Sequence, residues 1–436
     1  MSLTSAFHNA SSGLTVALRA ASVTSSNLAN VLTDGYAKRD LSVSARAIGG
    51  AFVGSTRRNV DQALLSDQRR ANAEHSGLEL EMKTHNRIER LIGSTEDPDG
   101  LSVLITNLET NLVSAITRPD QTVRITSVIN AADNLAAKIN KIGSDLKQMR
   151  QDADAELDQE VKLLNARLEE TSKLNRLIAA AGPSEQAGLM DRRQAVIDKI
   201  ARQVPIKTLD RGNGTVALLT PKGQFLLNDR PLPIEFSAHG MIAPGTQTLA
   251  QPTTLGSVLR LEGEGKIGAL LTLRDEILPH AQSQFDALAE DLVVRTTTPG
   301  FSLFSIPDTG ESAATLTLAP NLETTLSSST TDTVAQNLSL TLQALQERHQ
   351  TSYGTVDFAQ HTAQLGSAMS VSAHLNEQSL VASASRRTAL EELMAQSGVD
   401  TDEEMQSLLR IEKHFAANAK ALQTLENVYD TLLELG

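Results

Sequence analysis

Heptad stripes at both ends of the chain constrain its fold more than any other feature. Near the amino end, apolar residues recur at alternating steps of three and four: Leu3, Phe7, Ala10, Leu14, Ala17, Ala21, Leu28 and Val31. The one position of this stripe without an apolar residue is occupied by Thr24. Near the carboxyl end, Asn418 lies on a second stripe with Leu408, Ile411, Phe415, Leu422, Leu425, Tyr429 and Leu432. Such spacing predicts two helices with apolar seams. If the two ends pair, the middle of the chain is an outward insertion.

The middle of the chain is mostly helical in its periodicity, with one change of period. Apolar spacing predicts helices over 61–92 and 101–116, a very long helix after Pro119, and a further helix in LMDRRQAVIDKIARQV. At Pro205 the period becomes two, and turns such as Gly-Asn-Gly predict strands, with SVLRLEGEG as a further candidate. Helical spacing returns over 266–295, 333–348 and much of 356–396.

These patterns predict a mainly α fold with a β insertion. It combines paired N- and C-terminal heptad helices, a long-helix bundle and a small β-rich middle segment. We expect a terminal coiled-coil axial domain formed by residues 1–60 and 397–436. A helical domain is expected from residues 61–204, 266–295 and 333–396. Residues 205–265 are expected to form the β-rich segment, and residues 296–332 a loop or small β insertion.

Composition excludes several classes of function. The net charge of −13 disfavours binding to phosphate backbones, so no nucleic-acid partner is expected. The chain has no cysteine, which excludes disulfides and thiolate chemistry. No apolar run is long enough to span a bilayer, and no membrane association is expected. The amino terminus has neither a basic segment nor an apolar one, so it is not expected to be a cleaved secretory signal.

One pattern resembles an enzyme motif. Residues 263–268, GEGKIG, fit the G-x-G-x-x-G of dinucleotide sites, and Glu290 and Asp291 follow at about the right distance. However, those acids belong to the same predicted helix as Gly268, with no second parallel strand, so we interpret the pattern as a glycine turn before a helix. The nine histidines are scattered, and the acidic residues of EDPDG lack calcium-loop spacing. We therefore predict no catalytic residue, no metal site and no cofactor. The pairs Arg69-Arg70 and Arg192-Arg193 are expected on solvated faces.

The segment that ends the first predicted helix resembles the amino-terminal motif of bacterial flagellar axial proteins, the rod, hook and junction family. That motif combines a small-residue Gly-Leu start with Ser-x-Asn-(Ile/Leu)-Ala-Asn and then Gly-Tyr. The matching positions are Ser12, Gly13, Leu14, Ser25, Asn27, Leu28, Ala29, Asn30, Gly35 and Tyr36. Asp34 and Asp40 depart from the family pattern, which often has Pro and Gln there.

The carboxyl end is similar to the closing helix of the same family. The match is carried by Ser397, Gly398, Val399, Asp402, Glu403, Glu404, Leu408, Ala417, Asn418 and Ala419. The candidate assembly motif consists of fourteen residues from the two ends: Gly13, Leu14, Ser25, Asn27, Leu28, Asn30, Gly35, Tyr36, Leu408, Ile411, Phe415, Asn418, Leu422 and Leu425. Asn418 is either a register device on the seam or a solvent-facing residue.

The long helical region resembles one kind of flagellar axial protein more than the others. Residues 101–205, with GLMDRRQAVIDKIARQVPI, look like the helical region of the junction protein between flagellar hook and filament. That resemblance implies a structural subunit, secreted through the flagellar type III channel without a cleaved signal. It also implies self-assembly into a ring or tubular layer, contact with the hook protein and the second hook–filament junction protein, and an export chaperone at the C-terminal helix.

Other hypotheses remain open from the sequence. Another axial protein, such as the hook protein or the second junction protein, is the nearest. A soluble NAD(P)-dependent enzyme rests on residues 263–268 alone, and a cofactor titration separates it. A cytosolic coiled-coil scaffold predicts terminal helices that are ordered in the isolated monomer, whereas an axial protein predicts that they are mostly not.

Overall fold

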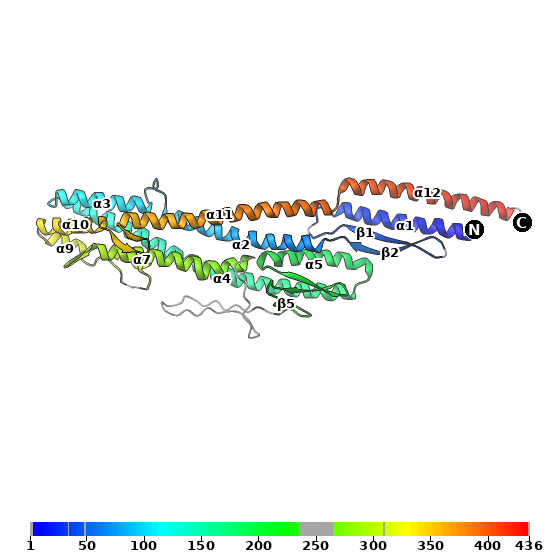
Figure 1. Cartoon of the computed structure of the whole chain (residues 1–436), viewed down its shortest axis with the longest axis horizontal. Coiled ribbons are helices and arrows are strands. Elements are labelled where there is room, and N and C mark those ends of the chain that lie inside the picture. The colour runs from blue at the N-terminus through cyan, green and yellow to red at the C-terminus, as the bar shows by residue number, and fades with distance from the viewer. Residues whose placement is uncertain are drawn as a thin grey trace. The chain divides into compact units, whose positions relative to one another are not determined.

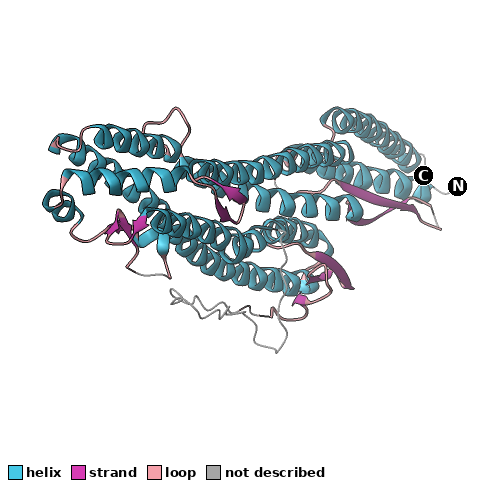
Figure 2. Ribbon diagram, turned by 60° about the vertical axis from the view of Figure 1, so that its left-hand side comes forward, coloured by secondary structure: helices cyan, strands magenta, loops and turns pink. Residues whose placement is uncertain are grey.

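A computed structural model describes residues 3–33, 35–47, 49–232, 234, 265–307 and 310–434. Helices dominate it, and in the part described every sheet is small and antiparallel (Figure 2). The mainly α fold predicted from the sequence is therefore confirmed. No helix among the described residues is long and apolar enough to cross a membrane. The strand predicted over 257–265 lies almost wholly outside the described residues.

The chain divides into two compact units, and three of the four boundaries fall within α2, α4 and α11. Unit 1 comprises 1–75, 162–234 and 383–436, and unit 2 comprises 76–161 and 235–382. The domain boundaries predicted from the sequence stay a prediction.

Unit 1 contains the terminal helix pair, formed by α1 (Leu3–Ala29) and α12 (Thr401–Glu434). The two chain ends lie at one end of this pair, because the helices are antiparallel (Figure 1). Beside α1, β1 (Arg39–Ala45) and β2 (Ala51–Arg58) form an antiparallel hairpin with a register shift after Leu41.

The rest of unit 1 is a helical layer that carries a three-stranded sheet. Its helical parts are the start of α2 (Gln62–Ile92), the end of α4 (Thr122–Ala180), α5 (Pro183–Gln203) and the end of α11 (Phe358–Ser397). The sheet has the order β3 (Lys207–Gly212), β4 (Thr215–Leu219), β5 (Phe225–Leu227). Asn175 of α4 anchors this sheet, because its amide donates to the Val216 carbonyl at 2.8 Å and accepts from the Val216 N–H at 3.3 Å.

Two arginines expected on solvated faces are buried in unit 1. Arg69 is paired with Asp198 at 2.8 Å, and Arg193 donates to the Asn175 side chain at 2.8 Å and to the Gly214 carbonyl. Burial lowers the pKa of Arg193 to about 10. The prediction was wrong for these two because their partners come from distant segments. It holds for Arg70 and Arg192, which are exposed.

Unit 2 is a helical bundle around one apolar core. Its other helices are α3 (Leu101–Thr117), α6 (Gly265–Thr272), the π-helix η1 (Leu273–Ile277), α7 (Leu278–Thr296), α8 (Ser312–Thr315), α9 (Leu322–Ser328) and α10 (Thr331–Gln346). Its short strands are β6 (Thr297–Thr298), β7 (Phe301–Ser302), β8 (Phe304–Ser305), β9 (Thr317–Leu318), β10 (His349–Thr351) and β11 (Gly354–Val356). The described residues of 296–332 thus form a mixture of short strands and short helices. They are ordered because Phe301, Leu303, Phe304 and Leu316 are buried in the core.

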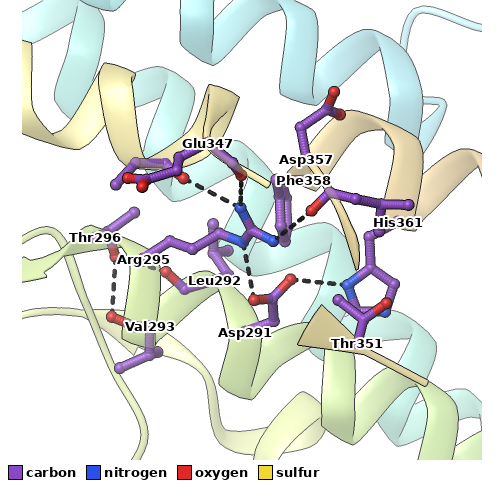
Figure 3. Close-up of polar contacts among 12 residues, drawn as sticks. Asp291, Leu292, Val293, Arg295, Thr296, Glu347, Thr351, Asp357, Phe358 and His361 are labelled. Carbon is purple, nitrogen blue, oxygen red and sulfur yellow. Dashed lines mark hydrogen bonds and ion pairs between the residues drawn. The ribbon is translucent and has the colours of Figure 1, made fainter. Parts of the chain in front are cut away.

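A buried arginine ties three elements of unit 2 together (Figure 3). Arg295 of α7 pairs with Asp291 at 2.8 Å and donates to the carbonyls of Ala344 and Glu347, at the end of α10, and of Val356 in β11. Asp291 also bonds His361 of α11 at 2.8 Å. Burial alone would raise the pKa of Asp291, but the hydrogen bonds from His361 and Arg295 outweigh burial and lower it. An acid that a dinucleotide site would need is therefore engaged within the fold.

Candidate assembly interface

The terminal helix pair is joined along the predicted seams. On α1 the heptad positions Ala10, Ala17 and Thr24 are buried. On α12 five of the predicted seam positions are half-buried, namely Leu408, Ile411, Asn418, Leu422 and Leu425. The other three, Phe415, Tyr429 and Leu432, are 38%, 58% and 54% exposed, so the predicted seam does not extend to the end of the helix. Because the facing residues of α1 are small, α1 alone leaves much of the α12 seam accessible.

Many large apolar side chains of the pair stay exposed. On α1 and the turn that follows it they include Leu18 and Leu32, which are 60% and 94% exposed, and on α12 Leu409, Tyr429 and Leu433, which are 56%, 58% and 64% exposed. A cavity of about 470 Å³ lies between the helices near the chain ends, lined by Leu3, Thr4, Phe7, Leu425, Glu426, Tyr429 and Asp430. Apolar surface of this kind typically marks an interaction site.

Asn27 is the polar centre of the predicted amino-terminal motif. Its side chain is 1% exposed. The amide group Nδ2 donates to the Arg39 carbonyl at 3.0 Å and to Glu404 Oε1 at 3.1 Å. The oxygen Oδ1 accepts from the Tyr36 hydroxyl at 2.8 Å and from the Arg39 N–H at 3.0 Å. We name these four residues, Asn27, Tyr36, Arg39 and Glu404, the Asn27 clasp. The clasp satisfies both donors and both acceptor positions of the amide, as a buried amide requires.

The contacts of the clasp explain why the amino-terminal motif lies at the end of α1. The Asn30 amide donates to the Ser26 carbonyl at 2.8 Å, which satisfies one of the last carbonyls of the helix. The turn after the helix then returns Tyr36 to Asn27, and burial raises the pKa of the Tyr36 hydroxyl. The two asparagines therefore have separate tasks, since Asn30 closes the helix and Asn27 joins it to β1 and α12.

Gly35 lies against α5 in the segment that follows α1. Its φ is +78°, and a Cβ built there would lie 2.8 Å from the Asp191 carbonyl oxygen and 3.0 Å from the Ala195 nitrogen. The Asp191 carboxylate also receives Arg39 at 2.6 Å and Arg58 at 2.7 Å. Gly35 thus allows the motif to contact the predicted Leu-Met-Asp-Arg-Arg helix.

We expect Gly35→Ala to destabilise unit 1 more than Gly212→Ala does. Both glycines have a positive φ, +78° and +82°, but a Cβ at Gly212 would meet nothing within 4 Å. Backbone strain alone costs about 1–2 kcal/mol at either site, and only Gly35→Ala must also displace the backbone of α5. The measurement is the free energy of unfolding of both variants in denaturant. Equal losses would show that the approach of Gly35 to α5 has no energetic importance.

Gly13 and Asn418 face one another at the middle of the terminal helix pair. A Cβ at Gly13 would lie 2.7 Å from Asn418 Oδ1 and 2.8 Å from Nδ2. The Asn418 amide donates to the His414 carbonyl of its own helix at 3.0 Å. Of the two interpretations left open for Asn418, this geometry favours the one that assigns it to the seam.

A double-mutant cycle should show that these two residues are coupled. Gly13→Ala alone forces the Asn418 amide to move, whereas Gly13→Ala with Asn418→Ala removes the obstructing group. We expect a favourable interaction energy of roughly 0.5–3 kcal/mol between the two substitutions, as is typical of residues in contact. Unfolding of the four proteins, followed by helical circular dichroism, measures it. Additive losses would mean that Gly13 does not pack on Asn418.

The structure brings together most of the predicted assembly motif. Leu14 and Leu28 are half-buried on α1, whereas the side chain of Ser25 is exposed. The candidate set lacked three residues of the site, namely Arg39, Asp191 and Glu404. The sequence contained a signal for two of the three, since Glu404 lies in the closing-helix match and Asp191 in the Leu-Met-Asp-Arg-Arg segment. No sequence pattern pointed to Arg39. Which residues act in assembly stays a prediction.

Comparisons with known proteins match two regions of the chain to models of flagellar proteins. Residues 85–297 match the family model described as the flagellar hook-associated protein FlgK helical domain, and residues 392–435 match the flagellar basal body rod FlgEFG protein C-terminal model. Flagellar hook-associated protein 1 of Bacillus subtilis is 25% identical over 222 residues, which are 47% of this chain and 44% of that protein. Flagellar hook-associated protein 1 of Escherichia coli is 20% identical over 305 residues, 66% of this chain and 55% of that protein.

A solved structure is also similar. The flagellar hook junction protein FlgK from Burkholderia pseudomallei aligns with a TM-score of 0.44 and 22% identity, over 55% of this chain and 46% of that one. The chain spans about half the length of the curated relatives that it matches. The resemblance inferred from the sequence is confirmed by the two family models, and the chain is similar to flagellar hook-associated protein 1 over the regions that these comparisons cover.

Proposed function

We propose that this chain is a structural subunit of the bacterial flagellum that forms the junction between hook and filament. The observation that carries the proposal is the match of residues 85–297 to the helical domain of the hook-associated protein FlgK. This match favours the junction protein over the hook protein, because it covers the region that distinguishes members of the family. No catalytic residue, metal or cofactor belongs to the proposal.

The terminal helix pair is the proposed assembly element. Its exposed apolar side chains and the cavity near Phe7 and Tyr429 support self-assembly into a ring or tubular layer. In this proposal, residues 1–60 plus 397–436 are the axial domain, and the hook protein and the second hook–filament junction protein are its neighbours. The α12 seam also offers an export chaperone a helix-in-groove contact. Secretion to the flagellum completes the proposal.

The test is to image flagella of cells that lack this protein. Hooks without filaments are expected, with filaments restored by the full-length chain and an epitope-tagged chain located at the hook end. Normal filaments in the deletion strain would contradict the proposal. Restored filaments with the tag located along the whole hook would indicate the hook protein instead.

A further inference from the structure

A cavity in unit 1 is lined by more cationic than anionic side chains. It has a volume of about 360 Å³ and lies where the segment after α1, the end of β2 and the helices α2, α5 and α11 meet. Volumes from about 300 to 1,000 Å³ are typical of small-molecule sites. The charged residues that line the cavity are Lys38, Arg58, Lys199, Arg202, Asp61 and Asp198.

The two acidic residues of this cavity wall are engaged elsewhere. Asp61 Oδ1 accepts from the N–H groups of Ala63 at 2.9 Å and Leu64 at 3.1 Å, at the start of α2. Asp198 pairs with the buried Arg69 at 2.8 Å, and Arg69 does not line the cavity. Among the described residues, neither carboxylate therefore forms an ion pair with a cation of the wall.

Arg58 has a donor that the fold leaves unsatisfied. Its Nε lies 2.7 Å from Asp191 Oδ1, but its buried Nη2 has no hydrogen-bond partner in the part of the chain that the structure describes. Buried polar groups almost always have a partner, and a bound ion is one explanation for an exception. Lys38, in contrast, is paired with Glu403 at 2.7 Å. Of these two cations, Arg58 is thus the one with a donor available to a ligand.

Lys199 and Arg202 add positive charge that no partner balances. Both are exposed on α5, and neither forms an ion pair with another described residue. Because they are three positions apart, they lie on the same face of the helix. A concave surface with an excess of one charge focuses the electric field and attracts counter-ions. The cavity should therefore attract anions, although the whole chain has a net charge of −13.

We propose that this cavity binds a small multivalent anion through Arg58, Lys199 and Arg202. Guanidinium groups match the oxygens of carboxylates and phosphates, and lysine adds a point charge. The ligand class is a small molecule that carries several carboxylate or phosphate groups. Such a ligand joins the end of β2 to α5, so its binding stabilises the folded protein. The inference goes beyond the junction function and does not rest on it.

The test is isothermal titration calorimetry of the purified full-length protein with citrate and, separately, with pyrophosphate, at constant ionic strength. Saturable binding of at least one of these anions is expected, and the tighter of the two assigns the site to carboxylates or to phosphates. The double substitution of Lys199→Gln with Arg202→Gln removes the two exposed cations. It should raise Kd by at least about tenfold, which is about 1.4 kcal/mol.

Arg192→Gln is the matched control. Arg192 is exposed on the same helix but does not line the cavity, so its substitution should leave Kd nearly unchanged. Without ligand, the double variant should melt within a few degrees of the original protein, which shows that lost binding is not lost folding.

Thermal unfolding separates a specific site from a general effect of salt. The anion that binds should raise the melting temperature of the original protein and of Arg192→Gln, but not that of the double variant. The proposal is wrong if neither anion binds saturably, if the double variant binds as tightly as the original, or if sodium chloride at the same ionic strength produces an equal rise. Any of these results would leave the junction proposal standing, because the imaging of filaments does not involve the ligand.

Discussion

Removal of residues 402–436 should leave a folded protein that cannot restore filaments. The apolar core of unit 2, as far as the structure describes it, draws its residues from helices and strands between α2 and α11 and none from α12. The deleted helix contributes Glu404 as its one buried residue. Full burial of a side chain such as Leu422 contributes roughly 1.5–3 kcal/mol, and α1 covers these side chains only in part. Most of that free energy should therefore be released on assembly.

Thermal unfolding and complementation measure the two halves of this prediction. The melting temperature of the truncated chain should lie within a few degrees of that of the full-length protein, while cells that carry it should lack filaments. A full-length variant with Glu412→Ser and Lys413→Ser, both exposed on α12, is the control and should restore filaments. A large drop in melting temperature would place α12 in the core of the monomer. Filaments built by the truncated chain would refute the assembly role of α12.

Arg295→Met should cause a large loss of stability. The guanidinium of Arg295 is fully buried, and it holds Asp291 and three backbone carbonyls, two of them at the end of α10. Methionine fits the apolar surroundings, but it leaves the Asp291 carboxylate with His361 as its remaining side-chain partner and leaves the carbonyls without this donor. Removal of one partner of a buried ion pair costs about 3–5 kcal/mol.

Arg348→Met is the matched control, because Arg348 is exposed beside Glu347 in the same region. Its free energy of unfolding should change by no more than about 0.5 kcal/mol. Denaturant unfolding, followed by helical circular dichroism, measures both variants. A loss below about 1 kcal/mol for Arg295→Met would mean that the buried pair barely outweighs its own desolvation, as happens for some buried ion pairs.

The helices were predictable because their signal is local and repeated. The seven-residue stripes place α1 and α12 within a few residues of their observed bounds, and the spacing after Pro119 predicts the long helix α4. The segment 296–332 was harder, since its apolar residues stand singly between Thr and Ser. Its short strands and helices are stabilised by the core of unit 2 rather than by a period of their own.

The polar contacts of the site could not be predicted, for a different reason. Asn27 stands beside the first heptad stripe as an ordinary helix residue, and its partner Glu404 is 377 positions away. Buried arginines pose the same difficulty. Arg69 and Arg193 look solvated by residue type, and only the fold supplies Asp198, Asn175 and the Gly214 carbonyl. Contacts of this kind form only when the fold brings distant segments together, so they leave no periodic pattern in the sequence.

The wide separation of Asn27 and Glu404 along the chain also sets an order of events. A chain that emerges from a ribosome or a narrow channel appears one end first, so one member of the terminal helix pair is always present long before the other. Until then water must hydrate the Asn27 amide, and the seam of the earlier helix has no partner within the molecule. Closure of the pair can follow only after the 377 positions that separate Asn27 from Glu404 have emerged. The contact thus requires that both Asn27 and Glu404 have been synthesised, and a chain terminated before Glu404 would lack it however well its middle had folded.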